Sequence, residues 1–283
     1  MSLTKFIAIP DVKERLTAEF SLPATSLKGP ILAPPITKNY GLVGTAFDYM
    51  MRFYLERLNP GCEKQPWVAE QSVELTKPAP RLFKATSKLL DFAKESYRHY
   101  LETGGLDDDI LSSTIFLAQL DVIYRAGILD PDIGKADPGD LKDLRNLIGA
   151  VDPNLFKAQR FCMLNPTFGE ASLLVGGADA DIVIDATLID IKTTKKLGFT
   201  REQFNQLVGY YVLNRISGRM GSVAGVSISK LGVYYSRYGL LHLIPVDFIE
   251  KKEDIKEFVS WFIDRAKSAY PEDRETRQGE SAD

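Results

Sequence analysis

Two aspartates and a lysine, set among apolar residues, are the part of this sequence best suited to chemistry. Asp181 lies in Asp-Ala-Asp-Ile-Val-Ile, and Asp190 and Lys192 lie in Leu-Ile-Asp-Ile-Lys-Thr. Carboxylate oxygens are the ligands that Mg²⁺ prefers, and a nearby ammonium group can stabilise negative charge or orient a water molecule. These residue types therefore indicate a site for a hard divalent cation.

The element that must position these side chains is predicted to be a β-hairpin. Its strands are expected at about 179–184 and 188–193, because both segments are rich in Ile, Val and Leu. Asp185 and Ala186 lie between them in a turn-type cluster. Side chains alternate between the two faces of a strand, so the length of the turn decides which residues face each other.

A two-residue turn places Asp181 opposite Asp190 and Asp179 opposite Lys192. Like charges directly opposite each other destabilise a ladder, and two carboxylates forced together either share a proton or hold a cation. The apolar flanks indicate that these carboxylates project into a cleft. A three-residue turn would instead place Asp190 opposite Ile182.

These residues resemble the PD-(D/E)XK nuclease superfamily in its RecB-like, lambda-exonuclease-like branch. That branch carries Gly-x-x-Asp, then a hydrophobic residue followed by Asp-x-Lys-Thr, then Gln-x-x-x-Tyr on a helix. The matching segments are Gly176–Asp179 or the overlapping Asp181, Leu188–Thr193 and Gln206–Tyr210. The resemblance covers residues 175–215, about a fifth of the chain once flanking elements are included.

The resemblance implies an α/β restriction-endonuclease-like fold, with a mixed central sheet flanked by helices and a helical insertion. It implies a Mg²⁺- or Mn²⁺-dependent deoxyribonuclease of the RecB-like exonuclease type, with DNA as its partner. DNA repair, recombination and phage-related defence are all open as its setting. The alternatives are a catalytically silent module of the same fold that binds DNA or a protein, and a metal-dependent enzyme acting on another substrate.

The resemblance also assigns roles to individual residues. The expected metal ligands are Asp181, Asp190, the carbonyl of Ile191, Asp179 as a substitute for Asp181, and Asp48. Lys192 is expected to orient the water or to stabilise the transition state, and Gln206 and Tyr210 to position the scissile strand. The candidate contacts to DNA are Lys195, Lys196, Arg201 and Gln203.

Asp48 has two interpretations. It ends Gly-Thr-Ala-Phe-Asp in a predicted helix over 45–58, where the family carries Gly-x-x-x-His. A carboxylate suits Mg²⁺ at least as well as imidazole does. The alternative is an ordinary acid in the first turn of a helix, where the helix dipole favours negative charge.

Composition limits the function classes. The net charge of −3 gives no global basic field, so any contact with nucleic acid must be local. Cys62 and Cys162 lie a hundred residues apart, which indicates no disulfide framework and favours a reducing, cytoplasmic compartment. Two cysteines are too few for the iron–sulfur cluster of some RecB-like nucleases. We expect no membrane span, because no run of about 18 apolar residues exists, and no signal peptide.

The rest of the chain is predicted to complete one domain over 1–270, with a helical insertion at about 64–165. The tail 271–283 is polar and is expected to be disordered. A strand is expected at 169–175 and a second hairpin at 226–236 and 239–245. Helices are expected at 11–20, 85–103, 109–126, 137–150, 201–215 and 248–270, the fifth of them capped by Thr200.

Overall fold

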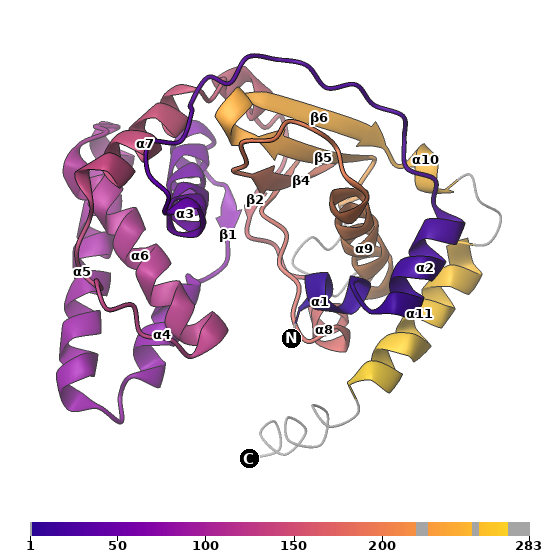
Figure 1. Ribbon diagram of the computed structural model, residues 1–283, viewed down its shortest axis with the longest axis horizontal. Helices are drawn as coiled ribbons and strands as arrows, with labels where there is room; N and C mark the ends of the chain where they lie inside the picture. Colours follow the sequence, from indigo (N-terminus) through magenta and orange to yellow (C-terminus); the bar gives the residue numbers. More distant parts are fainter. Residues whose placement is uncertain (1, 219–225, 251–254, 271–283) are drawn as a thin grey trace.

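The computed structural model describes residues 2–218, 226–250 and 255–270. They form a mixed six-stranded sheet whose strand order follows the chain, with helices packed on both of its faces (Figure 1). The strands are β1 (Glu63–Lys64), β2 (Cys162–Leu164), β3 (Ile182–Ile184), β4 (Thr187–Lys192), β5 (Lys230–Tyr235) and β6 (Leu240–Pro245). The prediction of a mixed α/β sheet flanked by helices is confirmed.

The hairpin β3–β4 has the predicted two-residue turn. Val183 pairs with Leu188, and Asp185 and Ala186 form the turn between the antiparallel strands. The alternative three-residue turn is therefore wrong. β3 begins one residue after Asp181, so this aspartate lies just outside the ladder rather than within it. Its side chain is free to turn toward β4.

The second half of the sheet is joined to the hairpin by a helical crossover. Helix α9 (Arg201–Ser217) leads from β4 to the parallel strand β5. Thr200 and Gln203 form the predicted capping box at its first turn. β5 and β6 pair as an antiparallel hairpin, and Gly239 between them has a φ of 58°, in the left-handed region that favours glycine.

Alternation along the strands divides the core into two layers. Val183 and Leu188 point into one layer, and Ile182 and Ile189 point into the other. The first layer contains α1 (Leu3–Ile7), α2 (Pro10–Glu19), α8 (Glu170–Leu174), α9, α10 (Asp247–Glu250) and α11 (Ile255–Ala269). The second layer contains α3 (Tyr40–Leu58), α4 (Val68–Leu75), α5 (Pro80–Thr103), α6 (Asp108–Ala126) and α7 (Pro138–Gly149).

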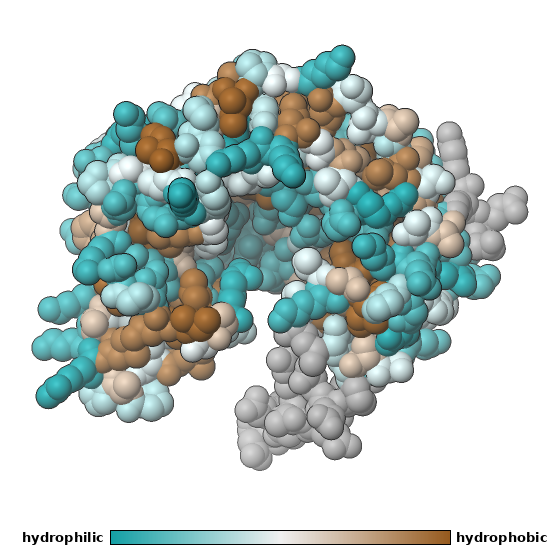
Figure 2. Space-filling model, in the orientation of Figure 1, coloured by the Kyte–Doolittle hydropathy of each residue, from teal (hydrophilic) through white to brown (hydrophobic). Residues whose placement is uncertain are grey.

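These two layers form two lobes around a hollow. In Figure 2 the surface is hollowed between the helices α3 to α6 and the part that carries α8, α9 and α11. Hydrophilic side chains gather on the walls of this hollow. Within the described ranges, the structure contains no helix with the length and apolar character needed to cross a membrane.

Two secondary-structure predictions are wrong or incomplete. The segment expected as a strand at 169–175 is helix α8, because β2 already occupies the place beside β3 in the sheet. The predicted helix 248–270 is described as α10 and α11, and residues 251–254 between them lie outside the described residues. The predicted disordered tail 271–283 also lies outside them.

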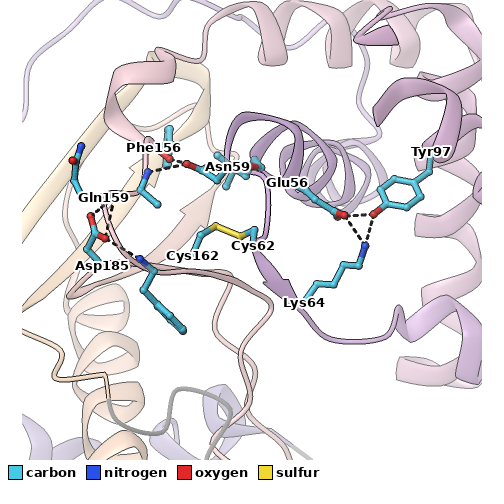
Figure 3. The surroundings of a disulfide bond; sticks show 12 residues. Glu56, Asn59, Cys62, Lys64, Tyr97, Phe156, Gln159, Cys162 and Asp185 are labelled. Carbon is cyan, nitrogen blue, oxygen red and sulfur yellow. Dashed lines mark hydrogen bonds and ion pairs between the residues drawn. A yellow bond between two sulfur atoms is a disulfide. The ribbon is translucent and has the colours of Figure 1, made fainter. Parts of the chain in front are cut away.

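The expectation of no disulfide framework, which is based on the separation of the two cysteines in sequence, is wrong for this pair. β1 and β2 run parallel and are hydrogen-bonded, which brings Cys62 and Cys162 to a Cα–Cα distance of 4.7 Å and joins them in a disulfide bond (Figure 3). The disulfide could not be predicted from the spacing of the cysteines, because the pairing of β1 with β2 brings them together. Disulfides are rare in reducing compartments, and the cytoplasmic location stays a prediction.

Candidate active site

Asp190 and Lys192 form a close ion pair on β4. The Asp190 side chain is 4% exposed, and its Oδ2 lies 2.7 Å from Nζ of Lys192. Burial raises the pKa of Asp190, while Lys192 acts in the opposite direction. Burial alone would lower the pKa of Lys192, but the charge and hydrogen bond of Asp190 outweigh it and the pKa is raised. Lys192 is therefore held as an ammonium group.

A chain of hydrogen bonds fixes this lysine from α9. Lys192 Nζ donates to Oε1 of Gln206 at 3.0 Å, and Nε2 of Gln206 donates to the Tyr210 hydroxyl at 2.9 Å. The Tyr210 hydroxyl in turn donates to the backbone carbonyl of Asp179 at 2.9 Å. Residues four apart lie on one side of a helix, which is why Gln206 and Tyr210 act together. We call Asp181, Asp190, Lys192, Gln206 and Tyr210 the hairpin wall.

Asp181 turns toward β4 from just before β3. Its Oδ2 accepts a hydrogen bond from the backbone N–H of Ile191 at 2.5 Å. Burial raises the pKa of Asp181 well above its ordinary value, and the charges of Asp190 and Asp48 raise it further. The carboxylates of Asp190 and Asp48 are therefore close enough to Asp181 for their charges to affect it. A role for the Ile191 carbonyl as a ligand stays a prediction.

Asp48, Asp181 and Ile191 line a cavity of about 380 Å³ between β4 and the helices α3 and α6, and the rest of the hairpin wall is not part of its lining. Its polar lining combines both predicted and unpredicted residues. Those that matter for chemistry are Asp48, Asp121, Arg125, Asp181, Ile191 and Thr193. The cavity is therefore built by elements that are far apart in the sequence.

Asp48 reaches the cavity from the third turn of α3. The helix begins at Tyr40, so the alternative that Asp48 is a first-turn acid favoured by the helix dipole is wrong, because that effect fades within the first turn. Oδ2 of Asp48 pairs with Arg52, while its Oδ1 is buried without a hydrogen-bond partner. The charge of Asp48 raises the pKa of Asp121 as well as that of Asp181.

Asp121 and Arg125 on α6 are functional candidates that the sequence reasoning missed. Asp121 is 2% exposed; its Oδ1 accepts a hydrogen bond from the Tyr49 hydroxyl at 2.6 Å, and its Oδ2 has no hydrogen-bond partner. Burial raises the pKa of Asp121. We call Asp48, Arg52, Asp121 and Arg125 the helical wall.

Arg125 is the exposed cation of the helical wall. Its side chain is 55% exposed and lines the cavity. Its Nε lies 3.5 Å from Oδ2 of Asp121, and its charge also lowers the pKa of Asp179, although burial keeps that pKa raised overall. The sequence signal for the pair was an acid in an apolar helix, followed by an arginine four residues later.

The remaining predicted residues lie around the site rather than in it. Asp181, not Asp179, lines the cavity, and Asp179 contributes its backbone carbonyl to Tyr210. Lys195 does not line the cavity. Its Nζ donates a hydrogen bond to the hydroxyl of Tyr40 at 2.6 Å, and Tyr40 is part of the cavity lining. Lys196 is exposed. Lys195 and Lys196 are therefore near the rim and available to solvent.

Arg201 and Gln203 have structural contacts instead. Arg201 Nη1 donates to the backbone carbonyl of Phe20 at 2.6 Å. Oε1 of Gln203 accepts from the backbone N–H of Thr200 at 3.0 Å and from the Tyr235 hydroxyl at 2.9 Å. Their contact with DNA stays a prediction that would compete with these bonds.

The cavity offers few carboxylates to a divalent cation. Within residues 2–218, 226–250 and 255–270, no three His, Cys, Asp or Glu side chains are grouped closely enough to hold a metal ion. Mg²⁺, however, needs only one or two carboxylates and completes its shell with water and phosphate oxygens. Asp181 and the unpartnered Oδ1 of Asp48 meet that smaller requirement in one cavity.

Comparisons of the chain with protein-family models, curated proteins and solved structures found no match. The resemblance to the PD-(D/E)XK superfamily therefore depends on the motif residues and their spacing alone. The geometry of the site has to carry any functional argument.

Proposed function

We propose that this protein is a Mg²⁺- or Mn²⁺-dependent nuclease that hydrolyses DNA phosphodiester bonds, of the RecB-like exonuclease type. The proposal includes a restriction-endonuclease-like arrangement of the mixed sheet. The observation that carries it is the Asp190–Lys192 pair, with Nζ and Oδ2 2.7 Å apart, near the half-buried carboxylate of Asp181. Phosphodiester hydrolysis needs such a combination of anionic ligands and a fixed cationic group.

The cation would be held by Asp181 and Asp48, with Asp190 beside them. When bound, a divalent cation lowers the pKa of a coordinated water and stabilises negative charge on phosphoryl oxygens. It would also offset the repulsion among carboxylates that raises the pKa of Asp181.

Lys192 supplies a positive charge that is already in place before substrate arrives. Its bonds to Asp190 and Gln206 hold the ammonium group, so little reorganisation is needed when negative charge develops on the phosphate. Gln206 and Tyr210 are positioning residues in this account. Tyr210 is 5% exposed and donates to a backbone carbonyl, which leaves it poorly placed to grip a DNA strand.

Arg125 is the proposed contact to the DNA backbone inside the cavity. Its guanidinium group is more than half exposed, and Asp121 anchors it from the same helix. A guanidinium group matches the oxygens of a phosphate in shape and charge. Such a contact supplies the local positive charge that a chain with a net charge of −3 requires.

The test is cleavage of end-labelled single- and double-stranded DNA in Mg²⁺ or Mn²⁺. Asp190→Ala and Lys192→Ala should each reduce the rate of cleavage about a thousandfold. Asp91→Asn and Lys88→Ala change exposed charges on α5 and should leave cleavage intact. Cleavage that survives in both site variants would overturn the assignment, because it would come from another site or a contaminant.

One observation favours the rival function, a catalytically silent module that binds DNA or a protein. Lys192 already neutralises Asp190, and the described residues contain no metal-binding group of three ligands. Metal-independent retention of DNA without cutting would support this module. If neither DNA nor RNA interacts with the protein, a metal-dependent enzyme with another substrate becomes the better account.

A further inference from the structure

A second pocket, of about 450 Å³, lies on the helical lobe away from the carboxylates. Its walls come from α4, from α5 and from the segment between β1 and α4. The residues that give it its chemistry are Lys64, Trp67, Glu70, Lys94, Tyr97 and Arg98. It thus combines two aromatic rings with three cations and a single acid, and neither the motif residues nor the proposed reaction makes use of it.

The aromatic part of the pocket is a fixed platform. The rings of Trp67 and Tyr97 meet edge to face, with centroids 5.2 Å apart and planes at 81°. Phe53 on α3 packs against both rings, at 5.3 Å from Trp67 and 4.6 Å from Tyr97. Rings held in this way can receive a flat ligand at little conformational cost.

The cations of the pocket are only partly neutralised. Lys94 pairs with Glu70, with Nζ and Oε1 2.6 Å apart, and Lys64 pairs with Glu56 at the same distance. Arg98 is exposed, and the one hydrogen bond found for it among the described residues runs from Nε to the Lys94 carbonyl at 3.2 Å. Its terminal guanidinium nitrogens therefore remain available to an anion.

The rim of the pocket is held in place by the sheet. Lys64 lies in β1 and is paired with Leu164 of β2, two residues after the disulfide cysteine Cys62. Nζ of Lys64 donates to the Tyr97 hydroxyl at 2.6 Å, and that hydroxyl donates to Glu56 Oε2 at 2.5 Å (Figure 3). The disulfide and this triangle of bonds keep a cation beside the aromatic platform.

We propose that this pocket binds one nucleotide of single-stranded DNA, with its base against Trp67 and Tyr97 and its phosphate at Arg98. Aromatic side chains that stack bases, combined with cations that follow the backbone, are how single strands are held without sequence preference. Lys64 and Lys94 line the same pocket, where each is already paired with an acid. The guanidinium group of Arg98, which has no acidic partner among the described residues, lies beside two aromatic rings and favours this anionic, aromatic ligand.

The position of the pocket fits a strand that also enters the carboxylate cavity. Both sites touch α3: Asp48 lines the first, and Glu56 buttresses the second. Eight helical residues separate them, about 12 Å of helix. The choice of DNA rests on the proposed function, but binding at this pocket requires no cleavage and can be measured separately.

The experiment uses Trp67 as its own reporter. The full chain carries Trp261→Phe, so that Trp67 is the remaining tryptophan, and fluorescence is titrated with (dT)₆ in EDTA, where a metal-dependent nuclease cannot cut. We expect saturable quenching. A hexamer of abasic deoxyribose phosphates should bind about tenfold more weakly, because base stacking is lost. Absence of quenching by (dT)₆ would overturn the proposal, as would equal affinity for the abasic strand.

Surface variants test the charges without disturbing the aromatic core. Arg98→Ala should weaken binding of (dT)₆ about threefold and reduce the slope of log affinity against log salt by about one. Glu70→Gln removes the acid from the lining and should tighten binding about twofold. The matched control is Arg81→Ala, an exposed arginine of the same helix outside the pocket, which should change nothing. Equal effects of Arg98→Ala and Arg81→Ala would contradict the assignment.

Failure of this inference and failure of the proposed function are distinguishable. Quenching in EDTA without cleavage in Mn²⁺ would support the nucleotide pocket and contradict the proposed nuclease activity. Cleavage in Mn²⁺ without quenching would support the nuclease activity and contradict the nucleotide pocket.

Discussion

The hairpin wall and the helical wall differ in how completely their polar groups are hydrogen-bonded. In the hairpin wall, consecutive hydrogen bonds link Lys192 to Gln206, Gln206 to Tyr210, and Tyr210 to a backbone carbonyl. In the helical wall, Oδ1 of Asp48 and Oδ2 of Asp121 are buried without hydrogen-bond partners, as are two nitrogens of Arg52. The hydrogen-bonding groups of Lys192, Gln206 and Tyr210 are paired, whereas the helical wall has buried polar atoms that could still bind a ligand.

This difference separates positioning from binding. A satisfied buried network fixes its members, which suits a group that must be in place before reaction. A buried polar atom without a partner costs about 1–3 kcal/mol, and that cost is offset when a cation or a substrate supplies the missing interaction. We therefore expect Lys192 and the residues that hold it to govern the rate, and Asp181 together with the helical wall to govern binding of metal and DNA.

The largest effect is expected from breaking the hairpin wall. Lys192→Ala removes the prepositioned cation and leaves Asp190 buried without its partner. The rate of DNA cleavage should fall about a thousandfold, with a smaller change in apparent DNA affinity. Single-turnover cleavage in Mn²⁺ measures this, with Lys88→Ala as the control. A fall of less than about tenfold would mean that the wall does not govern the rate.

The next effect comes from the bond that ties the helical lobe to the sheet. Replacing Cys62 and Cys162 by serine removes the disulfide and should lower the free energy of unfolding by about 2–4 kcal/mol. Urea unfolding of the oxidised protein against the double variant gives the number. The native protein in excess dithiothreitol should match the variant, and identical midpoints in all three samples would contradict the pairing.

A smaller effect is expected from the helical wall. Arg125→Ala should raise KM for DNA about tenfold and change kcat little, because the guanidinium group contacts the strand and not the reacting atoms. Arg125→Lys should recover part of the loss. Steady-state cleavage kinetics provide both constants, and Arg81→Ala is the matched arginine control. A loss confined to kcat would move Arg125 into the catalytic machinery.

The smallest effect concerns pH and stability without metal. Burial and the neighbouring acids Asp190 and Asp48 raise the pKa of Asp181 above its value in the unfolded chain. The folded state then binds the proton more tightly, so stability is greater at low pH and declines as pH rises through the raised pKa. Asp181→Asn should flatten this decline and raise Tm by a few degrees at neutral pH in EDTA.

Thermal unfolding across about pH 5 to pH 8 checks this sign. Asp91→Asn is the matched exposed acid and should follow the native protein. A native protein whose stability increased with pH, to the same extent as that of Asp181→Asn, would show that Asp181 is not under the stated repulsion.

Local pattern was enough to predict much of the hairpin wall. The apolar alternation and the two-residue turn fixed the register of β3 and β4, and the i, i+4 spacing placed Gln206 beside Tyr210. The capping box at Thr200 also depended on neighbours in sequence. Each of these features is decided within a few residues, so one sequence contains the information.

The helical wall and the disulfide could not be predicted in this way. Asp121 meets Asp48 only because α6 packs against α3, a contact between segments more than seventy residues apart. Cys62 meets Cys162 only because β1 joins β2. The strand expected at 169–175 became a helix for the same reason, since the sheet position beside β3 was already filled.

Binding of Mn²⁺ tests most directly whether the two walls meet around a cation. Electron paramagnetic resonance of free Mn²⁺, titrated with protein, should reveal a site in the native chain that Asp181→Asn abolishes and Asp48→Asn weakens about tenfold. Asp91→Asn should bind as the native protein does. A native protein that leaves Mn²⁺ free, or an Asp181→Asn variant that binds it unchanged, would contradict the account.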